Sequence, residues 1–373
     1  MVIKFASIGA RSTKFAFDIV KRGKSDIIVR NSTREAIISQ GPTGRQAWNG
    51  QTATVFGCTG FLGRYVVTQM AREGTRVVIP YRGISEHVRH LKPTGDLGMI
   101  IPMEFDLRNR KQLEECMAHS DVVVNLIGRN FETKNFTHEM VHIDGPIRIA
   151  EVAKDVGVAR LIHVSRLGVD SSSSSSILST KAKGERYLRE NFPETTIVRP
   201  ATMFGYEDEL LTNIGYWKTN FLTVKQATNI MRPVNVEDVA KAIGQMRQNE
   251  WTAGKVFELY NPNEYTQQEI INLCSMVLRE KVNAIDVPQG LLRLAARMID
   301  ILPYHYTSHH EVDLMGLDEI PTESSPENEI FTFEDLGIIP QTLEETAIRY
   351  LRHYRHFENE NKPMELNARA FRK

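Results

Sequence analysis

Short runs of apolar, mostly β-branched residues recur after Gly50, and stretches with helical spacing separate them. Such runs, without alternating polar positions, are typical of strands that are buried on both faces of a sheet. Helices between consecutive strands imply right-handed crossovers and parallel pairing. The pattern therefore predicts a doubly wound parallel α/β sheet of the Rossmann type, with strands at 52–57, 76–81, 100–105, 122–127, 161–165 and 195–198 and helices at 61–73 and 138–156.

The second half of the chain has a less regular pattern. Residues 201–230 show no clear period, and we expect a crossover or lid-like region there. A strand leading into a helix at 233–246, a strand at 255–260 and a helix at 266–279 predict a smaller mixed C-terminal lobe. Residues 288–302 carry an apolar stripe at helical spacing, which either faces the core of this lobe or lies against a partner subunit or a membrane surface.

The patterns divide the chain into four segments. They are an N-terminal arm at 1–50, a Rossmann nucleotide-binding domain at 51–200, the C-terminal lobe at 201–358, of which about 231–260 returns to the main domain, and a polar tail at 359–373. The arm contains nine basic and three acidic residues, and its first seventeen residues hold no acid. This composition is typical of a mitochondrial presequence. The alternative is a basic arm that is never cleaved.

Composition limits the function classes. The chain has 373 residues, of which 41% are hydrophobic and 25% charged, and its formal net charge is zero. A dedicated nucleic-acid-binding protein needs a clear basic surplus, so we expect no nucleic-acid partner. No stretch reaches the roughly 20 apolar residues of a membrane span. Three widely separated cysteines, Cys58, Cys116 and Cys274, favour a reducing compartment without a disulfide framework or a zinc site.

A glycine-rich turn lies between the first predicted strand and the first predicted helix. Gly57, Gly60 and Gly63 have the spacing G-x-x-G-x-x-G. The first glycine allows a sharp turn, the second lets a pyrophosphate approach bare backbone, and the third lets helix and strand pack closely. The start of the helix then directs N–H groups and partial positive charge at the phosphates. The residues expected to contact the nucleotide here are Gly57, Thr59, Gly60, Phe61, Leu62 and Gly63.

The end of the second strand distinguishes the two nicotinamide dinucleotides. A site that prefers NAD carries an acid there, which accepts hydrogen bonds from the ribose hydroxyls. This chain has Arg82 in that region instead. A guanidinium can bind the 2′-phosphate of NADP, which a carboxylate would repel. The sequence therefore favours NADP(H), unless Arg82 only caps a surface strand.

Two further segments follow strands in the order that a dinucleotide requires. Asp106 and Leu107 follow the third strand, and we expect them beside the adenine. Leu126, Ile127 and Gly128 follow the fourth strand, and we expect them along the nicotinamide ribose. Each is ordinary core or turn chemistry alone, so their order along the chain is what supports a cofactor site.

These motifs resemble the extended or atypical branch of the short-chain dehydrogenase/reductase superfamily, from about Thr52 to Tyr260. The resemblance includes GCTGFLG, Phe105–Leu107, Asn125–Gly128, His163–Ser165, Lys181–Glu185, Val198–Pro200 and Val236–Ala240. A closer resemblance, carried by ATVFGCTGFLGRYVV, VIPYRG, HLKPTGDLG, VVNLIGRNFETKNF and LIHVSRL, is to the nucleotide-binding accessory subunits of mitochondrial respiratory complex I (NADH:ubiquinone oxidoreductase). It implies that Ser165, Lys181 and Pro200 also belong to the cofactor site.

The chain departs from active members of the superfamily at one position. Those enzymes use a serine, a tyrosine and a lysine, with the tyrosine four residues before the lysine, one helical turn away. Lys181 matches the lysine, but Ile177 stands at the tyrosine position and has no proton to give. Loss of a positioned acid costs about a hundred- to ten-thousand-fold in rate, so we assign no catalytic residue. The alternative is a bulge in the serine run at 171–176 that brings another hydroxyl to the site.

The resemblance implies a non-catalytic accessory subunit that binds other complex I subunits, peripheral to the inner membrane on its matrix side, with NADP(H) as a structural cofactor. Two alternatives stay open. One is an active NADPH-dependent reductase or epimerase acting on a lipid, sugar or quinone, which would need a proton donor in place of Ile177. The other is a regulatory protein whose affinity for a partner depends on NADP(H).

Three histidines near the end of the amphipathic stretch raise the question of a metal. His305, His309 and His310 lie in a polar segment with no pattern of partnering ligands. We expect a solvated loop there and no metal site.

Overall fold

The computed structural model describes residues 48–171, 173, 175–300, 308–322 and 329–359. It also describes two short strands, β1 (Ile27–Val29) and β2 (Ala36–Ile38), which pair antiparallel. The possible presequence and the polar tail beyond Asn359 otherwise lie outside the described residues.

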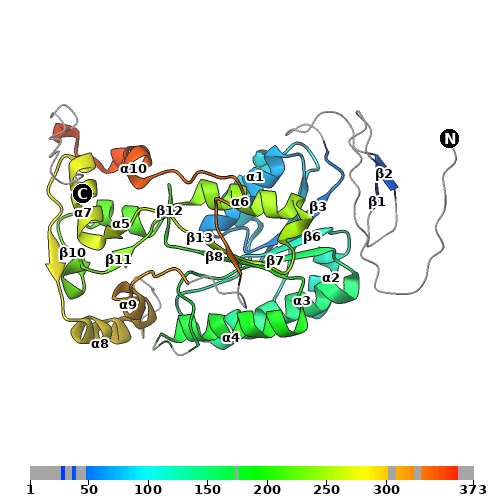
Figure 1. Ribbon diagram of the computed structural model, residues 1–373, viewed down its shortest axis with the longest axis horizontal. Helices are drawn as coiled ribbons and strands as arrows, with labels where there is room; N and C mark the ends of the chain where they lie inside the picture. The colour runs from blue at the N-terminus through cyan, green and yellow to red at the C-terminus, as the bar shows by residue number, and fades with distance from the viewer. Residues whose placement is uncertain are drawn as a thin grey trace.

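An eight-stranded parallel sheet forms the centre of the molecule (Figure 1), and the predicted doubly wound α/β fold is confirmed. The strand order places the first strand of the domain inside the sheet, so the chain winds outward in one direction and then in the other. In spatial order the strands are β16 (Ile330–Phe331), β13 (Val256–Leu259), β8 (Thr196–Pro200), β7 (Arg160–Val164), β6 (Val122–Asn125), β3 (Thr52–Phe56), β4 (Arg76–Tyr81) and β5 (Ile100–Glu104).

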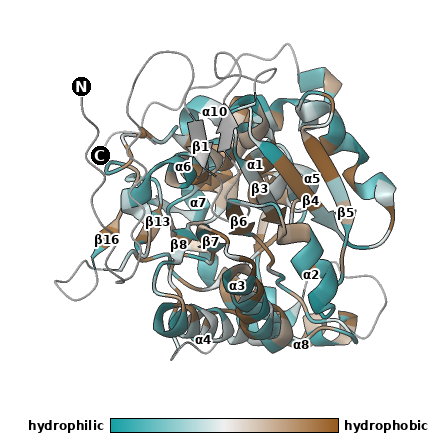
Figure 2. Ribbon diagram, turned by 90° about the vertical axis from the view of Figure 1, so that its right-hand side faces the viewer, coloured by the Kyte–Doolittle hydropathy of each residue, from teal (hydrophilic) through white to brown (hydrophobic). Residues whose placement is uncertain are grey.

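Helices cover both faces of this sheet. Figure 1 shows α1 (Phe61–Arg72) and α6 (Val236–Gln248) on one face and α2 (Arg110–Met117), α3 (Gly145–Val156) and α4 (Ser176–Asn191) on the other. The apolar strands lie between the two helical layers in Figure 2, which explains why their sequences do not alternate. Longer connections contain the 3₁₀ turns η1 (Ser85–Thr94), η3 (Lys225–Ala227), η4 (Glu250–Thr252), η5 (Arg352–Tyr354) and η6 (Phe357–Asn359).

The helix expected at 138–156 differs from the prediction at its start. A π-helical turn, η2 (Met140–Asp144), precedes α3. Pro146 in the first turn of α3 has no N–H to donate to the carbonyl of His142, so regular α-helical hydrogen bonding is interrupted there. The His142 carbonyl instead lies against α4, where a Cβ on Gly184 would come within 2.2 Å of it.

The C-terminal lobe is built from short elements at one end of the sheet (Figure 1). Residues 201–230, where the sequence shows no clear period, contain a helix and several strands of two or three residues. Elements this short leave no measurable period. The lobe contains α5 (Leu210–Tyr216), α7 (Gln267–Leu278), α8 (Gln289–Ile299), α9 (His309–Met315) and α10 (Leu343–Leu351), with strand pairs β9 (Met203–Phe204)–β12 (Val234–Asn235), β10 (Phe221–Thr223)–β15 (Ala284–Asp286) and β11 (Ile230–Met231)–β14 (Tyr265–Thr266).

The amphipathic stretch forms α8, but its apolar stripe does not face the core of the lobe. Leu291, Leu294 and Met298 are 62%, 61% and 67% exposed, and Ala296 is the buried residue of this helix. The core-facing interpretation of the stripe is therefore wrong. Exposed leucine and methionine at helical spacing form an apolar surface that a partner can cover.

The three cysteines are free and buried. Desolvation raises the pKa of the Cys58 and Cys116 thiols to about 12 and also raises that of Cys274. A thiol that keeps its proton is a poor nucleophile and a poor metal ligand. These cysteines therefore act as core residues.

A buried ionic network joins α4 to the strands β8 and β13. Arg199 on β8 binds Glu185 of α4 at 2.6 Å and Glu258 of β13 at 3.0 Å. The two carboxylate side chains are 3% and 0% exposed. Each charge is therefore stabilised by its partners rather than by water.

Replacing Arg199 with alanine is expected to lower the free energy of unfolding by about 3–5 kcal/mol, because the buried Glu258 would lose its counter-ion and Glu185 would keep only Arg189 at 3.9 Å. Urea unfolding followed by circular dichroism measures this. Arg110→Ala is the control, because Arg110 pairs with Glu114 at the surface, where solvent screens the pair and its loss should cost far less. Equal losses in the two variants would contradict the prediction.

Candidate nucleotide site

The glycine turn brings three backbone segments into direct contact. A Cβ on Gly63 would lie 2.2 Å from the carbonyl oxygen of Gly57, and a Cβ on Gly57 would lie 3.0 Å from the backbone of Leu126. Gly57 also has a φ of +80°, which side chains disfavour. The turn therefore closes β3 onto α1 and onto the end of β6 only with glycine at these positions.

The first turn of α1 presents backbone donors. Phe61, Leu62 and Gly63 are the first residues of the helix, so their N–H groups have no partner within it. Among the described residues, no side chain caps Gly60 and the first turn holds no acid. Thr59 and Gly60 are exposed beside it. This helix end can therefore accept an anion such as a pyrophosphate.

The segment after β6 lies across from the glycine turn. The amide of Ile127 donates to the side-chain oxygen of Asn125 at 3.0 Å, and the Asn125 amide group contacts the ring of His163 at 3.2 Å. These buried bonds fix the path of Leu126–Gly128 at the carboxyl edge of the sheet, where Gly128 is exposed. The side chain of Ile127 packs against the core, so this segment presents its backbone at the edge of the sheet.

Arginines gather at the ends of β4 and β5. The guanidinium groups of Arg82 and Arg108 each lie 5.1 Å from the ring centre of Phe136. Asp106 binds Arg108 at 2.9 Å, and this hydrogen-bonded partner lowers the pKa of the carboxyl. Leu107 is buried and packs against the core. Arg82 is exposed, and no carboxylate in the described part of the chain forms an ion pair with it.

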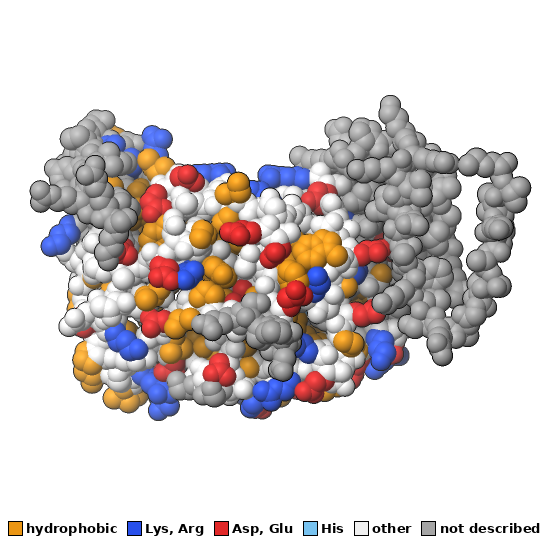
Figure 3. All heavy atoms as spheres, in the orientation of Figure 1, with side chains coloured by type: hydrophobic (Ala, Val, Ile, Leu, Met, Phe, Trp, Pro, Cys, Tyr) orange, Lys and Arg blue, Asp and Glu red, His pale blue; other side chains and the backbone are white. Residues whose placement is uncertain are grey.

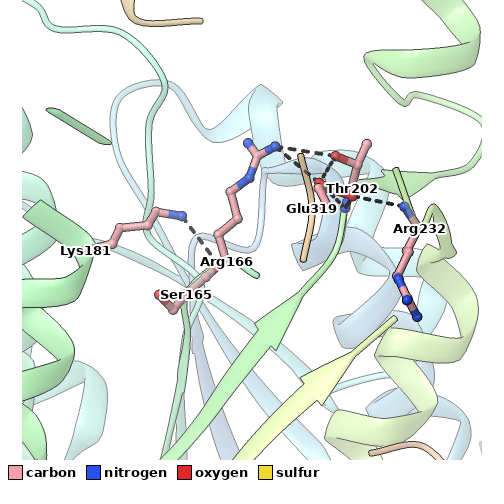
Figure 4. Close-up of polar contacts among 6 residues, drawn as sticks. All are labelled: Ser165, Arg166, Lys181, Thr202, Arg232 and Glu319. Carbon is pink, nitrogen blue, oxygen red and sulfur yellow. Dashed lines mark hydrogen bonds and ion pairs between the residues drawn. The ribbon is translucent and has the colours of Figure 1, made fainter. Parts of the chain in front are cut away.

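Ser165 directly follows β7 and Lys181 lies within α4, and Figure 4 shows the two residues side by side. The Lys181 amine donates to the Ser165 carbonyl at 3.4 Å. Desolvation, with Arg166 adding repulsion, lowers the pKa of Lys181 from 10.5 to about 8. The Ser165 hydroxyl is buried and has no hydrogen-bond partner in the described chain. A buried, unpartnered hydroxyl beside a lysine is available to a ligand.

The position four residues before Lys181 holds no replacement acid. Helix α4 runs without a break from Ser176 past Lys181, so the described backbone shows no bulge that would shift this register. Ile177 is 0% exposed. The hydroxyl groups of Ser179 and Thr180 donate to carbonyls of their own helix, at 3.1 and 2.8 Å. These hydroxyls are therefore already engaged.

A carboxylate from late in the chain, which no sequence motif marks, completes this edge of the sheet. Glu319 accepts hydrogen bonds from the backbone and hydroxyl of Thr202, and it also binds Arg166 at 3.4 Å (Figure 4). It lies beyond all the recognised motifs. The pairing orients Arg166, which in turn acts on Lys181. Pro200 ends β8 next to this cluster, and its carbonyl accepts from Leu167.

The histidines at 309–310 are not in a solvated loop, and that expectation is wrong. They begin α9, where Ser308 and Glu311 form a capping box. His309 binds Asp300, and the ring of His310 lies 4.6 Å from that of His138. His138 comes from far earlier in the chain, so no local spacing could reveal the contact. His305 lies outside the described residues.

The distribution of charge on the surface and the hydrophobicity of the helices are two properties by which highly charged and membrane-spanning proteins are recognised. Basic and acidic side chains are interspersed with small apolar patches on the face shown in Figure 3. Among the described residues, none of the helices combines the length and apolar character needed to cross a bilayer.

Comparisons with known proteins agree with the geometry. Residues 57–250 match a family described as NAD(P)H-binding. The 40 kDa subunit of mitochondrial NADH-ubiquinone oxidoreductase from Neurospora crassa is 43% identical, over 91% of this chain and 88% of that protein. Subunit 9 of the 1 alpha subcomplex of mitochondrial NADH dehydrogenase (ubiquinone) from Rattus norvegicus is 36% identical, over 86% and 85%. The fold matches triphenylmethane reductase of Citrobacter sp. complexed with NADP(H), with a TM-score of 0.61 and 17% identity, over 80% of this chain and 100% of that one.

The parallel sheet, the glycine turn and the family match define a Rossmann protein of the NAD(P)H-binding class. Within that class, the chain belongs to the family of the 40 kDa subunit, or 1 alpha subcomplex subunit 9, of mitochondrial NADH dehydrogenase (ubiquinone).

Replacing Gly63 with alanine is expected to lower the free energy of unfolding by about 1–3 kcal/mol and to reduce the nucleotide retained on purification, because the added methyl meets fixed backbone. Gly290→Ala in α8 is the control, since its Cβ would meet nothing within 4 Å. Denaturant unfolding and nucleotide content measure the two effects. A Gly63→Ala variant as stable as the control would contradict the close-packing argument.

The lowered pKa of Lys181 predicts a pH dependence in the nucleotide-free chain. Between about 8 and 10.5 the unfolded chain holds the proton that the folded chain has lost, so the free energy of unfolding should rise with pH in this window. The slope is at most about 1.4 kcal/mol per pH unit. Lys181→Met should remove this contribution, whereas Lys183→Met, at an exposed position, should keep it. Identical profiles of the two variants would refute the assignment.

Proposed function

We propose that this chain holds NADP(H) as a fixed, unconsumed cofactor within mitochondrial NADH dehydrogenase (ubiquinone). Membership of the subunit family supports a place in that complex, so its partners are the other subunits. The observation that carries the cofactor role is the combination at α4, where Lys181 is retained beside Ser165 and a buried Ile177 occupies the position of the missing acid.

The charge at the end of β4 supports NADP(H) over NAD(H). Arg82 is exposed, lies where the adenosine ribose of a dinucleotide bound to this fold would be, and has no described carboxylate as an ion-pair partner. Its neighbour Arg108 is already neutralised by Asp106. A 2′-phosphate would give Arg82 the anionic partner that the protein does not provide.

The residues proposed to contact the nucleotide lie along the carboxyl edge of the sheet. The turn Gly57–Gly63 and the start of α1 would hold the pyrophosphate, Asp106 would lie near the adenine, and Leu126–Gly128 would line the nicotinamide ribose. Ser165 and Lys181 would bind the nicotinamide half, and Pro200 would close the edge beside them. A bound nucleotide stabilises the folded chain by mass action even when it does not react.

The exposed stripe on α8 supports a peripheral place in the complex. Leu291, Leu294 and Met298 offer an apolar face that another subunit, or the inner membrane on its matrix side, would cover. This placement rests on the same family membership as the partners do.

Replacing Arg82 with aspartate is expected to weaken NADP(H) binding at least about tenfold and to affect NAD(H) less, because attraction to the 2′-phosphate becomes repulsion. Isothermal titration of the nucleotide-depleted full chain measures both affinities. Arg89→Asp is the matched control, as an exposed arginine of η1 close by in sequence. Equal weakening for both nucleotides, or in both variants, would contradict the assigned contact.

The absence of turnover is tested directly with the purified full chain. Loaded with NADPH and supplied with a panel of quinones, aldehydes and sugar-nucleotide ketones, it should retain its nucleotide, and absorbance at the NADPH band should not fall. Steady consumption of NADPH by any of these substrates would reject the structural role and favour a reductase.

A further inference from the structure

A buried histidine whose ring nitrogens have no hydrogen-bond partner in the described chain lies close to the candidate nucleotide site. His138 is 1% exposed, and neither of its ring nitrogens has a hydrogen-bond partner in the described part of the chain. Burying such a polar ring without partners is costly, so native structures rarely leave both nitrogens unused. The two ring nitrogens of His138 are therefore candidate ligand-binding atoms.

The neighbouring His142 is similarly buried, but both of its ring nitrogens have hydrogen-bond partners. Its ring stacks on His138 with centres 5.3 Å apart, and it is buried to a similar degree, at 3%. Its Nδ1 bonds the hydroxyl of Thr180 at 3.0 Å, and its Nε2 accepts from the amide of Arg129 at 3.3 Å. Burial alone thus does not explain the unpartnered nitrogens of His138.

Two further ligand groups converge on His138. Glu132, from the same loop after β6, and His310, from the first turn of α9, each bring one donor atom to within 4.8 Å of the others. Glu132 also accepts from the amide of His138 at 2.9 Å, which fixes the carboxylate beside the ring. The three groups therefore come from two segments that are far apart in the sequence.

We propose that Glu132, His138 and His310 bind a zinc ion. Two imidazoles and one carboxylate are a known zinc ligand set that leaves a fourth position for water. Donor atoms about 2 Å from a tetrahedral zinc lie about 3.3 Å apart, so three groups that now lie within 4.8 Å of one another need to close by up to about 1.5 Å through small rotations of their side chains.

Charges of both signs surround the cluster. Glu132 is the acid beside His310, whereas Asp300 and Asp313 are paired with His309 and Arg293. A cavity of about 440 Å³, lined by Glu132 and His138 among others, opens beside the cluster. His309 is held by Asp300 and so is outside the ligand set. The ion would tie the loop after β6 to α9, and with it the C-terminal lobe to the nucleotide domain.

The test uses the full chain, stripped of metal with a chelator and titrated with Zn²⁺ in competition with a chromophoric chelator. The wild type should bind one equivalent with a Kd of about 1 μM or tighter. Glu132→Gln and His310→Ala should each weaken binding at least about tenfold. His309→Ala and His353→Ala, a neighbouring and an exposed surface histidine, should bind as the wild type does.

Two readouts protect the test from a misfolded variant. Co²⁺ should give the visible absorption of a tetrahedral site in the wild type and lose it in His310→Ala, while far-ultraviolet circular dichroism of the metal-free forms stays the same. In the wild type, Zn²⁺ should slow hydrogen exchange in both the loop 129–139 and α9. Binding that is unchanged in Glu132→Gln and His310→Ala, or less than one equivalent in the wild type, would overturn the proposal.

Discussion

The geometry of the candidate nucleotide site depends on close contacts between backbone atoms at the glycine turn. The carbonyl of Gly57 leaves no room for a side chain on Gly63, and the same turn lies against the backbone of Leu126. β3, α1 and the end of β6 are thereby fixed in one geometry. The direction of the free N–H groups of α1 and the path of Leu126–Gly128 both follow from that contact.

Much of the fold could be predicted because its causes are local. The strands β4 and β5 contain the apolar runs at 77–80 and 100–103, and α3 ends at Val156, where the predicted helix ends, with Gly157 in the left-handed conformation after it. The glycine spacing and Arg82 also carry their chemistry within a few residues. The same holds for Ile177, since a helix fixes its position relative to Lys181 whatever the rest of the chain does.

Other features depend on contacts between distant segments and leave no local pattern. Glu319 meets Thr202 and Arg166 only because the late chain crosses the end of β8. His310 meets His138 for a similar reason. The side to which the apolar stripe of α8 faces also could not be predicted. An amphipathic helix has the same sequence pattern whether its own lobe or another protein covers its apolar face.

The reach of Glu319 has a consequence for how short a folded fragment of this chain could be. Its carboxylate accepts from the backbone of Thr202 across 117 residues of chain. A fragment that stops after β8 would contain the strands β3 to β8 but would lack a group that orders their carboxyl edge around Arg166. That edge is therefore complete only in a chain that extends past Glu319.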